Sequence, residues 1–414
     1  MTFYAGWRLL GVQGLAPEQH IGSAQLFDLV KLSFGVVAGA GALVALVNGY
    51  RRQRVDEARH RVDEAAALRE ETRLHTERFT AAIAQLGEPA EAVRLGAVHA
   101  LAGLADDAPT SGLRQTCIDV LCSFLRLPFT AEADGPDDDA SARNAYLALR
   151  EVRHTVIRLI RDHLRLLPEH PHSWQGFHFD FTSVAFDGGD FSGAKFSGAR
   201  VDFKDTIFSG ARVDFRRSSF CDGEVTFHGA MFSDCEVDFR GATFKGAKVD
   251  FSSTTFDASV SFRDATFSDG SVTFDGAMFL GSHVDFCSSF SGGSVSLGAE
   301  FSGDTVSFRG ASFAGSEVSF DSTNFSGSTA TFRGANFSGG TVHYDGTRFS
   351  EGKVTFRGAA FSGADITFHD AKFSGGKVDL SAAVGQPPSG LVPAHGENLP
   401  DGLILPPEWY PTKP

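Results

Sequence analysis

The chain has 414 residues, and phenylalanine dominates its aromatic content, with 40 Phe against 5 Tyr and 3 Trp. The net charge of −14 argues against a general nucleic-acid binder, because such proteins normally carry a basic surface. The five cysteines are too few and too scattered for a disulfide framework, so we expect reduced thiols at Cys117, Cys122, Cys221, Cys235 and Cys287.

A charge-free run occupies residues 32–50, between Lys31 and Arg51. A membrane span needs ~20 mainly apolar residues. We therefore predict a single transmembrane helix over residues 29–50, preceded by an N-terminal segment at residues 1–28. A buried helix of a soluble protein and a cleaved signal peptide are the alternatives.

The charges that flank this run predict its orientation. Arginines gather directly after it, from Arg51 to Arg61, whereas only Arg8 and Lys31 precede it. The positive-inside rule then places the C-terminal side in the cytoplasm and predicts a single-pass protein of the cell membrane. Within the run, Gly35 and Gly39 form a small-xxx-small pair, which predicts a helix face for homodimerisation.

Helix formers dominate the segment after the span. Residues 51–87 are rich in Ala, Glu, Arg and Leu and predict a charged stalk helix. Residues 88–173 predict a small α-helical domain with helices at 89–105, 111–126 and 143–167 and an acidic loop at 130–142. The expected inward side chains are Val93, Val98, Leu101 and Leu104, then Ile118, Leu121, Phe124 and Leu125, then Val152, Val156, Ile157, Ile160, Leu164 and Leu167.

From Phe181 onward the sequence is periodic. Aromatic residues are at first five apart, and then a 12-residue unit V-x-F-x-x-x-x-F-S-G-x-x takes over and continues to Leu380. V-x-F has the two-residue alternation of a strand, and Ser-Gly suits a tight corner. Recurrent Gly, Ser, Asp and Thr exclude helical repeats. We therefore predict a β-solenoid at residues 174–383, with identical Phe residues stacked inside it.

These residues resemble the pentapeptide-repeat family over residues 177–380. In that family a Leu or Phe recurs every five residues with a small residue two before it, as in Gly189-Asp190-Phe191, Ala194-Lys195-Phe196, Ala242-Thr243-Phe244, Ala265-Thr266-Phe267 and Ala335-Asn336-Phe337. The resemblance implies a mainly β fold, a right-handed four-sided β-helix with about twenty residues per coil. The V-x-F segments lengthen each unit by two positions, so we expect two units, about 24 residues, in each of about eight coils. A coil near the family's length is the alternative.

Acidic residues follow the repeat across residues 264–330, where only Arg309 opposes them. Gyrase-binding members of the resembled family mimic DNA by shape and acidity, but the ordinary interpretation of this stretch is a solvated surface. Asp285 is expected to be exposed on that surface. The Pro-rich residues 384–414 are expected to cap the last coil, through Leu403, Ile404, Leu405, Trp409 and Tyr410, or else to form a disordered tail.

No catalytic, cofactor-binding or metal-ligating residue is predicted, and the protein is expected not to be an enzyme. Ser192 and Lys195 match S-x-x-K only as part of the repeat. His170, His172 and His178 cluster in the sequence without a ligand pattern, and Cys117 and Cys122 lack metal spacing. The sequence predicts a membrane-anchored, non-enzymatic scaffold for an unidentified protein partner, with no direct nucleic-acid binding and no cofactor. The alternative is an acidic DNA-mimic modulator of a topoisomerase or another DNA-binding protein.

Overall fold

The structure is a computed structural model that describes residues 22–129, 140–198, 200–281, 283–392 and 399–410. Most of the predicted N-terminal segment 1–28, most of the loop 130–142 and parts of the tail 384–414 lie outside the described residues. The chain divides into two compact units, Met1–Arg73 and Leu74–Pro414.

The first unit is formed by most of one long helix, α2 (Ser23–Leu86), which runs without a break through the predicted span and stalk. Its apolar side chains are uncovered, with Leu32 and Phe34 each 71% exposed and Leu46 74% exposed. Among the described residues this is the one helix long and apolar enough to cross a membrane, judged by length and composition alone. Uncovered apolar surfaces of this kind are typical of membrane or protein interaction sites.

The second unit begins with the end of α2 and three shorter helices, α3 (Glu91–Asp106), α4 (Ser111–Arg126) and α5 (Ala140–Arg165), close to their predicted positions. The hydroxyl of Thr110 starts α4 by accepting the backbone N–H of Leu113 at 3.3 Å. The predicted inward faces are buried except at two positions. Val93 is 40% exposed because it lies in the first turn of α3, and Leu167 is 63% exposed because α5 ends before it.

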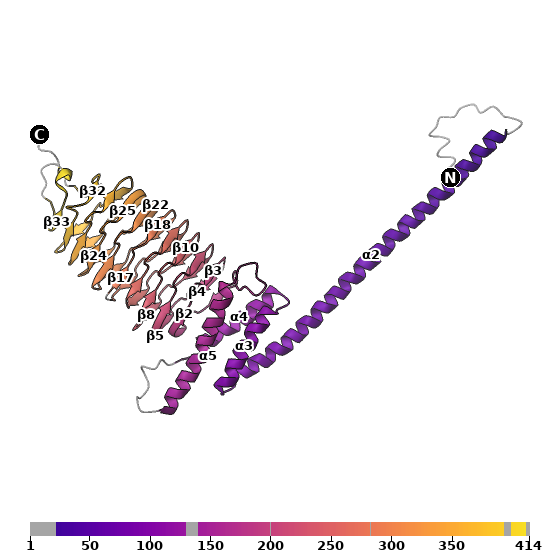
Figure 1. The fold of residues 1–414 in the computed structure, drawn as a ribbon, viewed down its shortest axis with the longest axis horizontal. Coiled ribbons are helices and arrows are strands. Elements are labelled where there is room, and N and C mark those ends of the chain that lie inside the picture. Colours follow the sequence, from indigo (N-terminus) through magenta and orange to yellow (C-terminus); the bar gives the residue numbers. More distant parts are fainter. Residues whose placement is uncertain (1–21, 130–139, 199, 282, 393–398, 411–414) are drawn as a thin grey trace. The chain divides into compact units, whose positions relative to one another are not determined.

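The repeat block is a β-solenoid of about nine turns built from two parallel sheets (Figure 1). The first sheet contains 16 strands: β1 (Phe179–Asp180), β3 (Lys195–Ser197), β4 (Arg200–Asp202), β6 (Ser219–Cys221), β7 (Glu224–Thr226), β10 (Thr243–Lys245), β11 (Lys248–Asp250), β14 (Thr266–Ser268), β15 (Ser271–Thr273), β18 (Ser289–Ser291), β19 (Ser294–Ser296), β22 (Ser312–Ser319), β25 (Asn336–His343), β28 (Ala360–Phe361), β29 (Asp365–Thr367) and β32 (Val384–Gly385).

The second sheet contains 17 strands: β2 (Ala185–Asp190), β5 (Ile207–Asp214), β8 (Met231–Ser233), β9 (Val237–Asp238), β12 (Thr255–Asp257), β13 (Val260–Ser261), β16 (Met278–Phe279), β17 (His283–Asp285), β20 (Glu300–Phe301), β21 (Thr305–Ser307), β23 (Asn324–Phe325), β24 (Thr329–Thr331), β26 (Arg348–Phe349), β27 (Lys353–Thr355), β30 (Lys372–Phe373), β31 (Lys377–Asp379) and β33 (Leu403–Ile404).

Strand register measures the length of each coil. Phe208 lies beside Phe232, two repeat units further along the chain. The number of residues between paired positions falls slightly in the middle coils, where Phe279 lies beside Phe301. It returns to two repeat units beyond Phe301, which lies beside Phe325. The paired positions are therefore 22 to 24 residues apart in the sequence. The turns number about nine rather than eight because β1 already pairs with β4, in the stretch where the aromatic residues have not yet reached the longer spacing.

Stacked phenylalanines fill the interior, as predicted. The rings of Phe208 and Phe232 lie 4.5 Å apart and 3° from parallel, and those of Phe251 and Phe274 lie 4.8 Å apart at 2°. The paired valines are buried beside them. Each ring therefore packs against the equivalent ring of the next coil, and burial accumulates along the stack.

The C-terminal segment covers the last coil over the residues that the structure describes. Leu403, Leu405 and Trp409 are buried, whereas Tyr410, also expected to pack there, is 45% exposed. The phenylalanine column ends where Gly385 pairs with Phe361, and a Cβ at Gly385 would lie 1.9 Å from the Phe361 carbonyl oxygen. The indole N–H of Trp409 donates to the Gly385 carbonyl oxygen at 2.9 Å and fixes the cap.

The helices of the second unit cover the other end of the solenoid, with α5 against β2 and α4 against β1 (Figure 1). Buried Arg153 donates to the carbonyl oxygens of Leu125, at 2.8 Å, and Ala185, at 2.5 Å. One continuous hydrophobic core runs from Ala82 to Trp409. The helical segment is therefore an N-terminal cap of the solenoid, a role that the sequence analysis did not predict.

Candidate functional site

The middle residue of V-x-F caps the turn that follows it. Its side-chain oxygen accepts the backbone N–H two residues on, as Asp238 does from Arg240 at 2.9 Å and Asp285 from Cys287 at 3.0 Å. Threonine and serine do the same elsewhere, as Thr331 does from Arg333 at 3.3 Å. Asp, Ser and Thr recur at this position because they cap turns in this way.

This capping corrects the expectation for Asp285, which is 3% exposed rather than at the surface. The guanidinium of Arg263 covers it from the adjacent coil, with Nε 2.9 Å from Oδ2. Asp214 and Asp238 are buried in the same way. Part of the acidity counted from the sequence is therefore internal and already paired.

Asp238 is the most enclosed of these carboxylates, with 0% exposure and three arginines around it. Arg240 donates to both carboxylate oxygens and Arg212 donates to Oδ2, while Arg216 Nε lies 3.8 Å from Oδ2. Burial acts to raise the pKa of Asp238, but the hydrogen bonds and charge of these arginines outweigh it and hold the pKa below its usual value. The carboxylate is thus a fixed counter-ion for the arginines.

On the second sheet, the residue after the Phe of V-x-F forms a column along one edge of the solenoid, which we call the arginine row. Hydrogen bonds between the turns stack these positions, as when Arg217 N donates to Arg240 O at 3.0 Å and Gly334 N to Arg357 O at 3.1 Å. The row contains Arg216, Arg240, Arg263, Arg309, Arg333 and Arg357, with Cys287 between the third and fourth. Sequence reasoning missed it, although the recurrent F-R was visible.

A groove of about 650 Å³ lies at the first turns of this row, lined by Arg165, Arg216, Arg217, Arg240 and neighbouring residues. Most of its cationic groups are already bound. Arg216 makes paired bonds to Asp214, Arg240 to Asp238, and Arg165 donates to the Ser192 carbonyl oxygen at 2.8 Å. The arginines of this groove therefore join α5 to the first coils and bind neighbouring groups of the protein.

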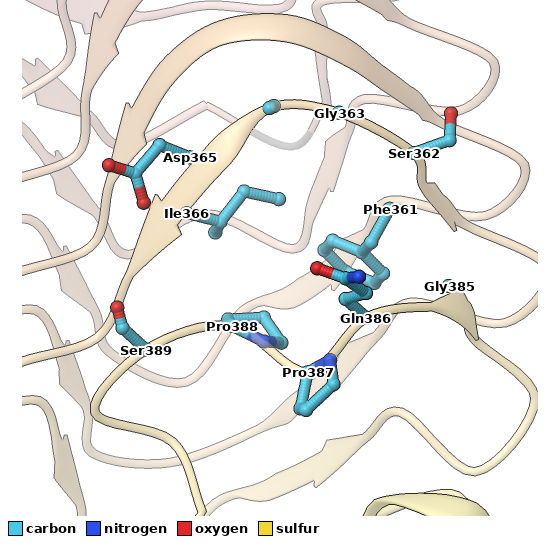
Figure 2. Close-up of a pocket in the computed structure, with 11 residues that line it drawn as sticks. Phe361, Ser362, Gly363, Asp365, Ile366, Gly385, Gln386, Pro387, Pro388 and Ser389 are labelled. Carbon is cyan, nitrogen blue, oxygen red and sulfur yellow. The ribbon is translucent and has the colours of Figure 1, made fainter.

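A second hollow, of about 710 Å³, lies at the C-terminal end (Figure 2). Figure 2 shows Ile366 pointing into it and Asp365 on the other side of the strand, with Pro387 and Pro388 opposite. It exists because Gly385 leaves Phe361 without a stacked ring on that side. The residues that line it include one ionisable side chain, Asp365, so no pair of acid and base faces the hollow.

The histidines singled out in the sequence do not converge on a common point. The rings of His170 and His172 lie 5.4 Å apart, whereas His178 accepts the backbone N–H of Arg200 through Nδ1. No group of three His, Cys, Asp or Glu suited to a metal occurs among the described residues. Ser192 lies instead in a turn of the repeat, where its backbone N–H donates to Oδ1 of Asp190 at 3.0 Å.

All five cysteines are free, and most are held as thiols by burial. Burial raises the pKa of Cys117 to about 11, and that of Cys122 and Cys235 to about 12. The pKa of Cys287 is raised by burial and by its bond to Asp285. A thiolate nucleophile is therefore disfavoured at these four positions.

Comparison with known proteins identifies the repeat. Residues 227–278 match the family model described as pentapeptide repeats (9 copies). The matched segment contains strands β8 to β15 and lies within the predicted block. No curated protein and no solved structure matches the chain. Over these residues the chain is similar to pentapeptide-repeat proteins, in agreement with the resemblance found in the sequence.

Proposed function

We propose that this protein is a non-enzymatic scaffold, anchored in the cell membrane through residues 29–50, that presents its β-solenoid to a protein partner in the cytoplasm. Three features support the proposal: the uncovered apolar part of α2, the arginines that follow it, and a solenoid with outward columns of side chains at fixed spacing. The pentapeptide-repeat match supports an interaction role by similarity.

The repeat itself is a variant of the pentapeptide coil in this proposal, right-handed and four-sided, with two 12-residue units per coil. Four ladders of paired strands, two in each sheet, support four sides. The pairing of Ser219 with Thr243 and of Glu224 with Lys248 supports two units per coil, since the chain passes through V-x-F twice between paired strands.

The observation that carries the scaffold role is an exposed apolar column on the second sheet, which we call the apolar row. Ile207, Met231, Thr255 and Met278 pair in register on successive strands and point outward. Ile207 and Met231 are each 45% exposed and Met278 is 39% exposed. Ile207 and Met231 are direct neighbours, and Thr255 separates them from Met278. Neighbouring exposed apolar side chains of this kind support a protein-binding surface.

Cross-linking and pull-down from membranes with the tagged full-length chain tests this function. A partner that docks on the apolar row is captured by the parent and lost in the Met231→Lys, Met278→Lys variant. The matched control is Asn336→Lys, an exposed position on the other sheet, which should leave capture unchanged. Equal capture by all three chains would reject the apolar row as the docking site.

The DNA-mimic alternative remains the second proposal, favoured by the net charge of −14. The burial of Asp214, Asp238 and Asp285 under arginines weakens it, because these charges are not displayed. Capture of a topoisomerase or another DNA-binding protein in the same pull-down, competed by duplex DNA, would favour the mimic over the membrane scaffold.

A further inference from the structure

The last coils of the solenoid separate their charges onto two sides. Residues 301–380 hold eight acids and seven bases, so the segment is close to neutral overall. The seven bases lie on the second sheet or in the turns that follow it: Arg309, Arg333, Arg348, Lys353, Arg357, Lys372 and Lys377. All seven are exposed. We call this surface the basic face.

The basic face lacks the internal counter-ions that the earlier coils have. Arg216, Arg240 and Arg263 are paired with Asp214, Asp238 and Asp285. In the later coils Ser307, Thr331 and Thr355 replace those capping aspartates. Within the described part of the chain, Arg309, Arg333 and Arg357 make no ion pair.

Like charges are also stacked directly on this face. Arg348 lies beside Lys372, and Lys353 beside Lys377, in parallel register. Neighbouring strands are ~4.8 Å apart, and like charges placed opposite one another are unfavourable. Glu351 and Asp379 are the only acids nearby on these described strands and corners. An anionic surface placed against this face would relieve the repulsion.

The opposite side of the same coils is acidic. Glu317 and Asp365 point outward from β22 and β29, and Asp321, Asp345 and Asp370 occupy the turns after the first sheet. Arg309 and Asp321, like Arg333 and Asp345, are half a coil apart in the sequence, so they lie on opposite edges. We call this surface the acidic face.

We propose that the partner of the basic face is the acidic face of a second copy of this chain, with the solenoids side by side and their axes parallel. The pitch of both faces is set by the same coil spacing of ~4.8 Å. When one charge of the basic face meets one of the acidic face, its neighbours in the next coils therefore meet as well.

This contact is heterologous, since each copy uses a different face, and it can continue to a third copy. Exposed ion pairs are individually weak and screened by salt, so the association depends on a high local concentration. Anchoring in a membrane would supply that concentration. The inference adds a second partner to the scaffold proposal and rests on it only for this anchoring.

Charge-reversal variants of two differently tagged, co-expressed full-length chains test the proposal. The basic-face variant carries Arg309→Glu, Arg333→Glu and Arg357→Glu. The acidic-face variant carries Glu317→Lys, Asp365→Lys and Asp370→Asn, which keeps the caps that Asp321 and Asp345 provide to the backbone N–H groups of Asp345 and His369. Co-purification of one tag with the other, after brief cross-linking at low and high salt, is the measurement.

The parent should associate at low salt and lose that association at high salt. Each variant should associate with itself roughly tenfold less than the parent, since three charges are reversed in the basic-face variant, and two are reversed and one removed in the acidic-face variant. The two variants mixed together should associate again, because the unchanged acidic face of the basic-face variant meets the unchanged basic face of the acidic-face variant. The recovery also shows that both variants are folded.

Two results would overturn the proposal. Unchanged association of the basic-face variant with itself would mean that another surface, such as Gly35 and Gly39 of α2, joins the copies. Loss of association without recovery in the mixture, with both variants folded by circular dichroism, would assign the basic face to a different anionic surface such as lipid headgroups. Neither result affects partner capture by the apolar row, so the scaffold proposal is tested separately.

Discussion

The guanidinium of Arg263 donates from Nε to Oδ2 of Asp285, in the adjacent coil, at 2.9 Å. The bond links two coils whose backbones are already paired, and it buries a carboxylate that also accepts the backbone N–H of Cys287. Side chains outside the solenoid core thus add to the contacts between coils. The phenylalanine stack and the capping aspartates therefore contribute separately to stability.

Replacing Phe274 and Asp285 individually by alanine measures these two contributions. Phe274 is 0% exposed and stacks on Phe251, so Phe274→Ala should cost about 3–5 kcal/mol. Asp285→Ala should cost roughly 1–3 kcal/mol because it leaves a buried N–H unsatisfied and an arginine unpaired. Chemical denaturation is the measurement. Asp304→Ala, at an exposed corner outside the left-handed backbone region, is the control, and a Phe274→Ala variant as stable as the parent would contradict the stacked core.

Tyr344 predicts a stabilising substitution. It occupies a phenylalanine position, stacked between Phe320 at 4.6 Å and Phe368 at 4.5 Å, and its hydroxyl is buried without a hydrogen-bond partner among the described residues. Burial raises the pKa of this hydroxyl well above its ordinary value of 10.0. Tyr344→Phe should stabilise the protein by about 1–3 kcal/mol in denaturation, and Phe320→Tyr should destabilise it. A less stable Tyr344→Phe variant would show that the hydroxyl is satisfied.

The period of the sequence predicted the solenoid well because each coil repeats one packing arrangement. Phe208, Phe220 and their equivalents had to stack once each coil contained two repeat units. Strand alternation, however, placed Asp285 outward, and the prediction failed because the turn after it folds the carboxylate back onto the backbone. The preference for Asp, Ser and Thr at that position was the available signal.

The partner of an amphipathic helix is harder to predict from one sequence. The apolar residues Val152, Val156 and Ile160 indicated a buried face of α5, but nothing in their spacing said that the face meets β2. That contact depends on groups far apart in sequence, as when His154 Nε2 meets the Asp187 carbonyl oxygen at 2.8 Å. The arginine row was missed for another reason, since net charge alone conceals how charge is distributed between edges.

Truncation tests the helical cap. Because α4 and α5 cover the first coil, residues 74–414 should form a more stable and more soluble fragment than residues 174–414, which expose Phe186 and its neighbours. Both fragments should give circular dichroism spectra with β-sheet character. Thermal melting and light scattering provide the comparison. Identical melting of the two fragments would mean that the helices do not cap the solenoid.

Membrane topology tests the anchor independently of any partner. The uncovered apolar side chains of α2 and the arginines after residue 50 predict a single span with the C-terminus in the cytoplasm. A reporter fused after Pro414 should be active only in its cytoplasmic form. Full recovery of the chain in the soluble fraction, after lysis without detergent, would exclude the span.

The pair formed by His163 and Asp106 predicts a pH dependence of the helical cap. His163 Nε2 lies 3.1 Å from Asp106 Oδ2, and Trp174 Nε1 donates to Oδ1 at 3.1 Å. Burial opposes protonation of His163, but its bond to Asp106 and the charge of that carboxylate raise the pKa above the ordinary 6.5. Since the folded pKa is the higher one, the stabilisation is complete below pH 6.5 and is lost as the pH rises through the folded pKa.

Asp106→Asn removes the charge and keeps an oxygen for the Trp174 bond. The free energy of unfolding of the parent should therefore exceed that of this variant most at pH 6, and the difference should shrink by pH 9. The difference isolates the pair from His75 and His154, whose pKa values are lowered by burial and whose effects run in the opposite direction. His172 Nδ1 also lies 3.8 Å from Asp106 Oδ2, so the matched control is the double variant His163→Gln, His172→Gln. Without both histidines the effect of Asp106→Asn should no longer depend on pH in this range. A constant difference between parent and Asp106→Asn from pH 6 to pH 9 would show that His163 gains no protonation from this carboxylate.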